Sequence, residues 1–291
     1  MLDALPRRVT LTLPELRLVA QRAGGAPLPF DVQDPRPASA LEGRLGTTRA
    51  TAEDDAYAAA LASLHDPEQS LTRRDLVGGE SERGLLGAVG LLATPQTALD
   101  IDVTAAGLRA RAWHRRSGSA VASLATIDGI VFELAWFHSS AWADELARVA
   151  VLPEDWRPGE SEVPAFVDIP FELADAASQA ARVGRRDLVP VLADHAEPVR
   201  GVDGEPVPVA EAAVVLSALA TESRGRLRAM VADLREPETH VVGVVSWTLL
   251  ADGWRALRPR EVDGLQRVQV DAVTPADLGG ELAPVLAEVS A

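Results

Sequence analysis

Two stretches of this sequence follow the pattern of a β-hairpin, and they constrain the fold more than any other feature. In Ser119–Trp136 and in Val241–Leu257, an apolar, β-branched run leads into an Asp-Gly pair and then into a second apolar run. Glycine adopts positive φ angles without steric cost and aspartate tolerates them, so Asp128-Gly129 and Asp252-Gly253 suit tight two-residue turns. We therefore predict two β-hairpins, one in each half of the chain.

The segments around each hairpin extend it into an antiparallel meander. Alternating apolar residues separated by short turns are typical of neighbouring antiparallel strands. Periodicity leaves Thr221–Val231 open between a strand and a helix end. In the first half the pattern predicts strands at Thr97–Thr104, Leu108–His114, Ser119–Ile127 and Ile130–Trp136. In the second half it predicts strands at His240–Leu249, Trp254–Leu257 and Gln266–Ala272.

Each half also begins with a strand, a proline and a helix. Val9–Leu13 alternates as a strand does, and Pro14 precedes the helical pattern Glu15–Ala23. Phe166–Ile169 and Pro170 stand in the same relation to the helical residues after them. Further helices are predicted at Gly84–Ala93 and Ala141–Val149 in the first half, and at Leu188–Ala196, Val209–Ala220 and Pro275–Val289 in the second. The extended stretch with Leu28, Phe30 and Val32 alternates as an edge strand would.

The order strand, helices, meander, helix therefore occurs twice, which predicts an α+β fold built from a divergent duplication. The halves are residues 1–152 and 165–291, and the acidic, proline-rich segment 153–164 is the linker between them. We expect the two halves to form one continuous domain.

Composition narrows the class of protein. The chain has 291 residues, 47% of them hydrophobic, which is typical of a folded globular protein. It lacks an apolar run of about 18 residues, so no transmembrane helix is expected. Its N-terminus lacks the order of a secretory signal, and we expect a cytoplasmic protein. Cysteine, lysine and asparagine are absent. Lysine and asparagine have AT-rich codons, so their absence indicates a GC-rich source such as an actinobacterium.

Charge and motifs argue against several functions. The net charge of −15 would repel a polyphosphate backbone, so no nucleic-acid partner is expected. Metalloprotease, P-loop, nucleophile-elbow and EF-hand motifs are absent. Gly84, Gly87 and Gly90 are explained by close helix packing, and Asp100 and Asp102 by a solvated sheet face. We therefore predict no catalytic residues, no cofactor and no metal site.

Tryptophan and arginine supply the candidate binding residues. Trp247 and Trp254 belong to the second hairpin, where they are either core residues or anchors for a partner on an uncovered sheet face. Arg115 and Arg116 open a predicted turn at Arg115–Gly118, where they would suit acidic helices. These four residues are the candidate protein-binding site.

Three segments resemble a known family. They are VTLTLPELRLVAQRAGGAPLPFDV, GLLGAVGLLATPQTALDIDV and SGSAVASLATIDGIVFELAW, and they are similar to the ESX (type VII) secretion-associated EspG family of actinobacteria. Pro29-Phe30, Leu92–Pro95 and Asp128-Gly129 occupy the places of that family's structural motifs. The likeness covers most of the chain and is firmest in its first half.

The resemblance implies a cytosolic, non-enzymatic chaperone. Its expected fold is quasi-two-fold α+β, with a central antiparallel sheet flanked by two helical subdomains. Its expected partner is a helical secreted protein or heterodimer, PE–PPE-like or WXG100-like, which it keeps soluble and correctly targeted. Two alternatives stay open: a hydrolase that uses Asp100, Asp102 and a histidine, and a structural component of a secretion apparatus without a client.

Overall fold

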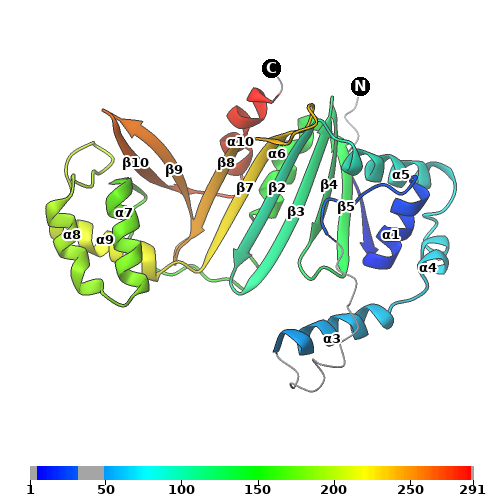
Figure 1. The fold of residues 1–291 in the computed structure, drawn as a ribbon, viewed down its shortest axis with the longest axis horizontal. Coiled ribbons are helices and arrows are strands. Elements are labelled where there is room, and N and C mark those ends of the chain that lie inside the picture. The colour runs from blue at the N-terminus through cyan, green and yellow to red at the C-terminus, as the bar shows by residue number, and fades with distance from the viewer. Residues whose placement is uncertain (1–4, 32–48, 290–291) are drawn as a thin grey trace. The chain divides into compact units, whose positions relative to one another are not determined.

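The computed structural model describes residues 5–31 and 49–289, and within them the protein is an α+β fold with a ten-stranded antiparallel sheet and nine α-helices (Figure 1). The strands are β1 (Arg7–Thr12), β2 (Thr97–Ala105), β3 (Leu108–Ser117), β4 (Ala120–Thr126), β5 (Val131–His138), β6 (Phe166–Pro170), β7 (Gly225–Asp233), β8 (His240–Leu249), β9 (Trp254–Val262) and β10 (Leu265–Val273). The helices are α1 (Leu13–Arg22), α3 (Arg49–Ala62), α4 (Pro67–Arg73), α5 (Gly79–Ala93), α6 (Trp142–Val149), α7 (Phe171–Arg182), α8 (Val189–His195), α9 (Val209–Thr221) and α10 (Asp277–Glu288).

Apart from the edge strand expected at Leu28 and Phe30, the predicted strands and helices are confirmed, and their ends shift by up to five residues, as at Gly79 of α5 and Val262 of β9. The open segment Thr221–Val231 contains the end of α9 and most of strand β7. Strand order in the sheet is β1-β5-β4-β3-β2-β7-β8-β9-β10-β6. Counted outward from β2 and β7, each side therefore has four meander strands followed by the first strand of its own half. A common origin of the two halves stays a prediction.

The chain divides into two compact units that interleave in sequence. One contains residues 1–98 and 112–140, and the other contains residues 99–111 and 141–291. The segment 153–164, predicted as a linker, carries no helix or strand, but the boundary between the units does not fall on it.

The first unit is built on a well-capped helix and an aromatic cluster. Thr12 Oγ1 accepts a hydrogen bond from Glu15 N, and the Glu15 carboxylate accepts one from Thr12 N, which fixes the start of α1. The expected edge strand at Leu28 and Phe30 is wrong, because the Phe30 ring packs with Phe132 and with Trp113, at 5.1 Å from each. Val32, the third residue of that prediction, lies outside the described residues.

The two turns are longer than the predicted two residues, because residues 127–130 connect β4 to β5 and residues 250–253 connect β8 to β9. In the β4–β5 turn, Asp128 Oδ1 accepts hydrogen bonds from Ile130 N and Val131 N, and Gly129 has a φ of 72°. In the β8–β9 turn, Leu250 N donates to Gly253 O, and Asp252 forms an ion pair with Arg255 at 2.6 Å. Both hairpins are confirmed by the strand pairing.

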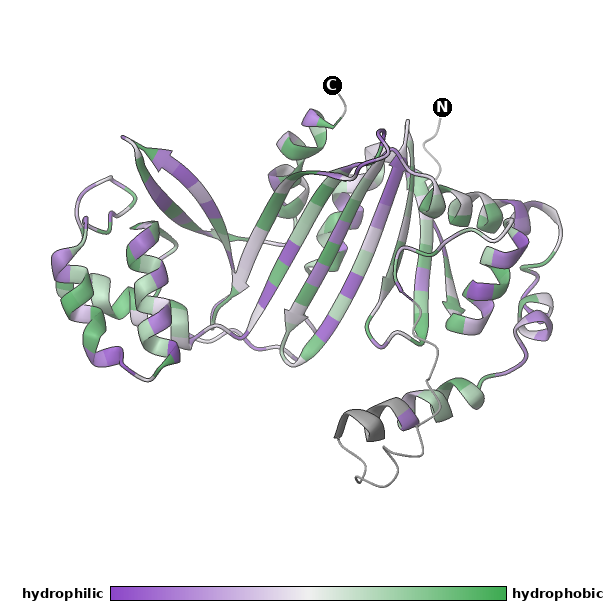
Figure 2. Cartoon of the chain, in the orientation of Figure 1, coloured by the Kyte–Doolittle hydropathy of each residue, from purple (hydrophilic) through white to green (hydrophobic). Residues whose placement is uncertain are grey.

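In the second unit, α7, α8 and α9 gather in one cluster (Figure 1). Their apolar faces share a core with strands β6 and β10, and its members include Val167, Leu173, Val189, Leu216 and Val270. Figure 2 shows hydrophilic and hydrophobic residues alternating along the strands, as expected for a sheet whose two faces differ in environment.

Candidate functional site

The two tryptophans predicted to anchor a partner are buried. Trp247 is 1% exposed and Trp254 is 2% exposed, and their rings lie 6.1 Å apart. Trp254 Nε1 donates a hydrogen bond to Ala150 O at 2.9 Å. Large aromatic rings bury the most apolar area, and here both tryptophan rings bury that area inside the protein core. Of the two roles left open for Trp247 and Trp254, the core position is the one observed, and neither ring lies on an uncovered sheet face.

The predicted arginine turn is also wrong. Arg115 and Arg116 are residues of strand β3, which continues to Ser117. The Arg115 side chain is buried at 7% exposure and donates to His114 O, while Arg116 donates to Thr97 Oγ1 at 3.4 Å. Neither residue is presented on a turn.

One carboxylate of the hydrolase alternative, Asp102, lies beside two arginines. Asp102 forms an ion pair with Arg109 and lies 3.8 Å from Arg111. Burial, reinforced by the neighbouring charge of Arg115, lowers the pKa of His114 to about 3, so this imidazole is neutral near pH 7. Among the side chains of residues 5–31 and 55–289, no group of three or more histidine, aspartate or glutamate residues is placed to hold a metal ion.

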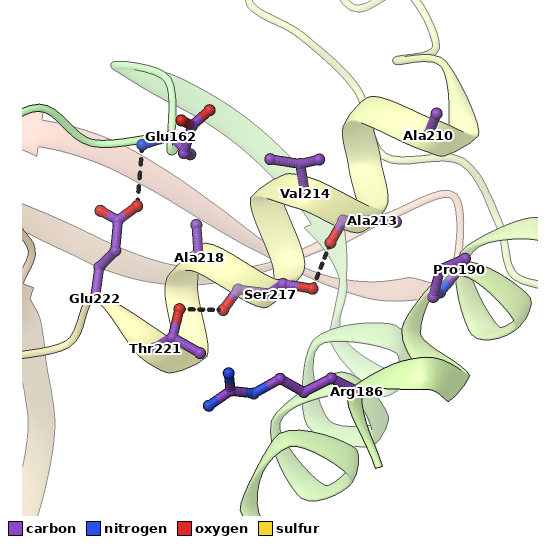
Figure 3. Close-up of a pocket in the computed structure, with 10 residues that line it drawn as sticks. All are labelled: Glu162, Arg186, Pro190, Ala210, Ala213, Val214, Ser217, Ala218, Thr221 and Glu222. Atoms are coloured by element: carbon purple, nitrogen blue, oxygen red, sulfur yellow. Dashed lines mark hydrogen bonds between the residues drawn. The ribbon is translucent and has the colours of Figure 1, made fainter. Parts of the chain in front are cut away.

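An apolar groove follows helix α9 in the second unit, and Figure 3 shows its lining. Its volume is about 540 Å³, within the range of ligand-binding clefts. Pro190 of α8 and Arg186 lie on one side of it. We call this feature the α9 groove, and α9 itself contributes Ala210, Ala213, Val214, Ser217, Ala218 and Thr221.

The spacing of these α9 residues explains the groove. They recur at intervals of three and four, so they share one helix face. All are small, which leaves room for another chain to approach the helix backbone. Ser217 Oγ donates to Ala213 O and Thr221 Oγ1 donates to Ser217 O, so both hydroxyls are satisfied within the helix. Because these two hydroxyl groups already have partners, this face of α9 is more apolar than its serine and threonine would suggest.

Charged groups stand at the rim of the α9 groove. Glu222 accepts hydrogen bonds from Ser161 Oγ at 2.6 Å and from Glu162 N at 3.0 Å. These bonds hold the segment that contains Ser161 and Glu162 against the end of α9. Across the groove, the guanidinium group of the exposed Arg186 makes no hydrogen bond or ion pair with any group that the structure describes. The rim therefore carries both signs of charge around an apolar floor.

Beyond α9, one face of the β7–β8 pair is open. In register, Arg226 lies opposite Thr248, Arg228 opposite Ser246, and Met230 opposite Val244. Arg226 and Arg228 are exposed, whereas the alternate residues of β7 are buried. Helix α10 packs on the buried face, because a Cβ atom on Gly243 of β8 would lie 2.7 Å from Cγ1 of Val285 in α10. We call the opposite, arginine-bearing side the β7–β8 open face.

The sequence contains a signal for the α9 groove, although no binding residue was predicted on α9. The spacing of small residues along α9 was visible, but α9 is apolar on most of its circumference and five of its residues are buried. Which of its faces would be left uncovered depends on how α7 and α8 pack beside it.

None of the helices in the described part of the chain combines the length and the hydropathy that a membrane span needs.

The described part of the protein thus has an α+β fold in which two four-stranded meanders, with β1 and β6 at the ends, form one ten-stranded antiparallel sheet. No protein-family model and no curated protein matches the sequence. Among solved structures, the fold is similar to that of the type VII secretion system chaperone EspG5 of Mycobacterium tuberculosis, determined in complex with a PE25–PPE41 dimer. The TM-score is 0.59 over 96% of each chain, with 11% sequence identity. The likeness concerns the fold.

Proposed function

We propose that this protein is a cytoplasmic, non-enzymatic chaperone of a type VII (ESX) secretion system. Its client would be a helical secreted protein or heterodimer, PE–PPE-like or WXG100-like, which the chaperone keeps soluble and directs to the secretion apparatus. The observation that carries the proposal is the fold shared with EspG5 over 96% of both chains. The α9 groove gives the proposal a physical basis.

The α9 groove suits a helical or apolar client segment. An amphipathic helix binds a protein by laying its apolar face into an apolar groove. Small side chains on α9 would let the client approach closely and exclude water, and removal of apolar surface from water drives such binding. In the free client, the same apolar segment would favour self-association, which is the state that a chaperone prevents.

The test is co-expression of this chain with the small helical proteins encoded beside an ESX locus in the same genome. A soluble complex of fixed stoichiometry, measured by size-exclusion chromatography with light scattering, is the expected result. Absence of a complex with every such pair would contradict the chaperone function. A client-free structural component predicts no complex with any pair, whereas a chaperone predicts a complex with at least one pair. The experiment therefore distinguishes these two functions.

A pair of variants then tests the groove. Val214 is 47% exposed and lines the groove, whereas Val191 is 54% exposed and does not. Val214→Glu places a carboxylate in the interface, where desolvation of an unpaired charge is costly, so the affinity for the client should fall at least about tenfold. Val191→Glu makes the same chemical change on α8 and should leave binding intact. Equal binding by both variants would remove the α9 groove from the interface.

A further inference from the structure

The β7–β8 open face carries two arginines with no internal partner. Arg226 and Arg228 are exposed, and neither guanidinium group forms a hydrogen bond or an ion pair with any group that the structure describes. On β8, their cross-strand neighbours are the hydroxyl residues Thr248 and Ser246, which supply no negative charge. Strand β2, on the other side of β7, carries Asp102, but that carboxylate forms an ion pair with Arg109.

Strand geometry fixes the spacing of these two cations. Residues two apart on a strand point to the same side and lie about 6.8 Å apart along it. Residues four apart on a helix are separated by about 6 Å along its axis and also share a face. A helix with two carboxylates at that spacing can therefore meet both guanidinium groups, each of which can bind a carboxylate through two hydrogen bonds.

Apolar side chains complete the surface. Met230 and Val244 lie opposite each other one step farther along the strands, and Val244 is 41% exposed. Methionine adapts its shape to irregular partners, which suits a contact surface. The open face thus runs from a cationic end to an apolar end.

We infer that the β7–β8 open face is an interaction surface for an acidic helix of a partner protein, whose carboxylates bind Arg226 and Arg228 and whose next apolar residue contacts Met230 and Val244. The identification of that partner as the secreted client rests on the proposed function. The recognition of an acidic helix by this face does not depend on the proposed function. Arg226 is four residues beyond Glu222 at the rim of the α9 groove, so one client could engage both surfaces.

The first test uses two helical peptides of about 20 residues. One carries glutamates four apart and a leucine in the following turn, and the other carries glutamine in place of glutamate. Fluorescence anisotropy should show that the protein binds the glutamate peptide at least about fivefold more tightly, with a preference that declines as salt rises. Equal affinity for the two peptides would overturn the inference.

Charge-reversal variants assign the effect to the surface. Arg226→Glu with Arg228→Glu should abolish the preference for the glutamate peptide. Arg73→Glu with Arg182→Glu changes the net charge equally at two exposed helix ends and should retain it. Thermal denaturation checks that each variant folds, and Arg226→Gln with Arg228→Gln replaces the reversal if it does not. An unchanged preference in the folded Arg226 and Arg228 variant overturns the inference.

Two further arms separate the possible causes. If single-stranded DNA of similar length binds more tightly than the glutamate peptide and the same reversal abolishes this, the surface belongs to a nucleic-acid partner and the inference is overturned. In the client co-expression experiment, a client complex that survives the reversal overturns the role of this face in client binding but leaves the chaperone function standing. A preference for the glutamate peptide without any client complex supports acidic-helix recognition and counts against the chaperone.

Discussion

Helices α6 and α10 of the second unit meet at a residue that has no room for a side chain. A Cβ on Gly279 would lie 2.7 Å from Ala143 Cβ and 2.9 Å from Ala143 Cα. Gly280, the next residue of the same helix, has no atom within 4 Å of the corresponding position. Substitution of each by alanine therefore gives a matched pair that differs in this one contact.

The magnitude follows from two opposing effects. Alanine in place of glycine in a helix stabilises by about 1 kcal/mol at either position. At position 279, the helices would have to separate by about 0.9 Å to restore ordinary contact, and overpacking of this kind costs about 1–3 kcal/mol. Leu278 and Leu282, both fully buried, would lose contacts as α10 moves. Gly280→Ala should therefore be more stable than Gly279→Ala by about 1–3 kcal/mol.

Urea denaturation followed by tryptophan fluorescence measures this difference. Trp254 is a suitable reporter because its indole bonds to Ala150, one residue after α6 ends. Adding Ala143→Gly to Gly279→Ala removes the nearer of the two clashing atoms and should recover part of the loss, which appears as coupling in a double-mutant cycle. Equal stability of the two alanine variants, or no coupling with Ala143→Gly, would refute the close packing of α6 on α10.

Two pH-linked predictions concern the first unit. Burial, then the charge of Arg115, lowers the folded pKa of His114 to about 3, so protons favour the unfolded state below its pKa of about 6.5. This linkage should cost about 2 kcal/mol between pH 7 and pH 5, and His114→Gln should flatten that part of the profile; parallel wild-type and variant profiles would contradict it. Burial raises the pKa of Asp128, but the hydrogen bonds from Val131 N and Ile130 N outweigh it, so the folded pKa is lowered. Asp128→Ala should cost about 1–2 kcal/mol at pH 7 and progressively less as the pH falls through that pKa, whereas Asp128→Asn keeps the acceptor and should cost less.

Local sequence patterns were sufficient for the elements and for their order. Apolar alternation and the Asp-Gly pairs predicted both hairpins, and Pro14 and Pro170 marked the starts of the helices that follow β1 and β6. These signals depend on φ preferences and on periodicity within a few residues, so they can be read without knowledge of the tertiary structure. The α+β class and the antiparallel sheet followed from them.

Exposure, in contrast, was decided by tertiary packing. A tryptophan in a strand has the same local pattern whether its face is covered or open, and only the packing of the second unit placed Trp247 and Trp254 in the core. Arg115 was misplaced because β3 continues past His114, which depends on pairing with distant strands. Tertiary packing likewise decides which face of α9 stays uncovered and whether the guanidinium groups of Arg226 and Arg228 find partners. These contacts join residues that are distant in the sequence, so local patterns do not predict them.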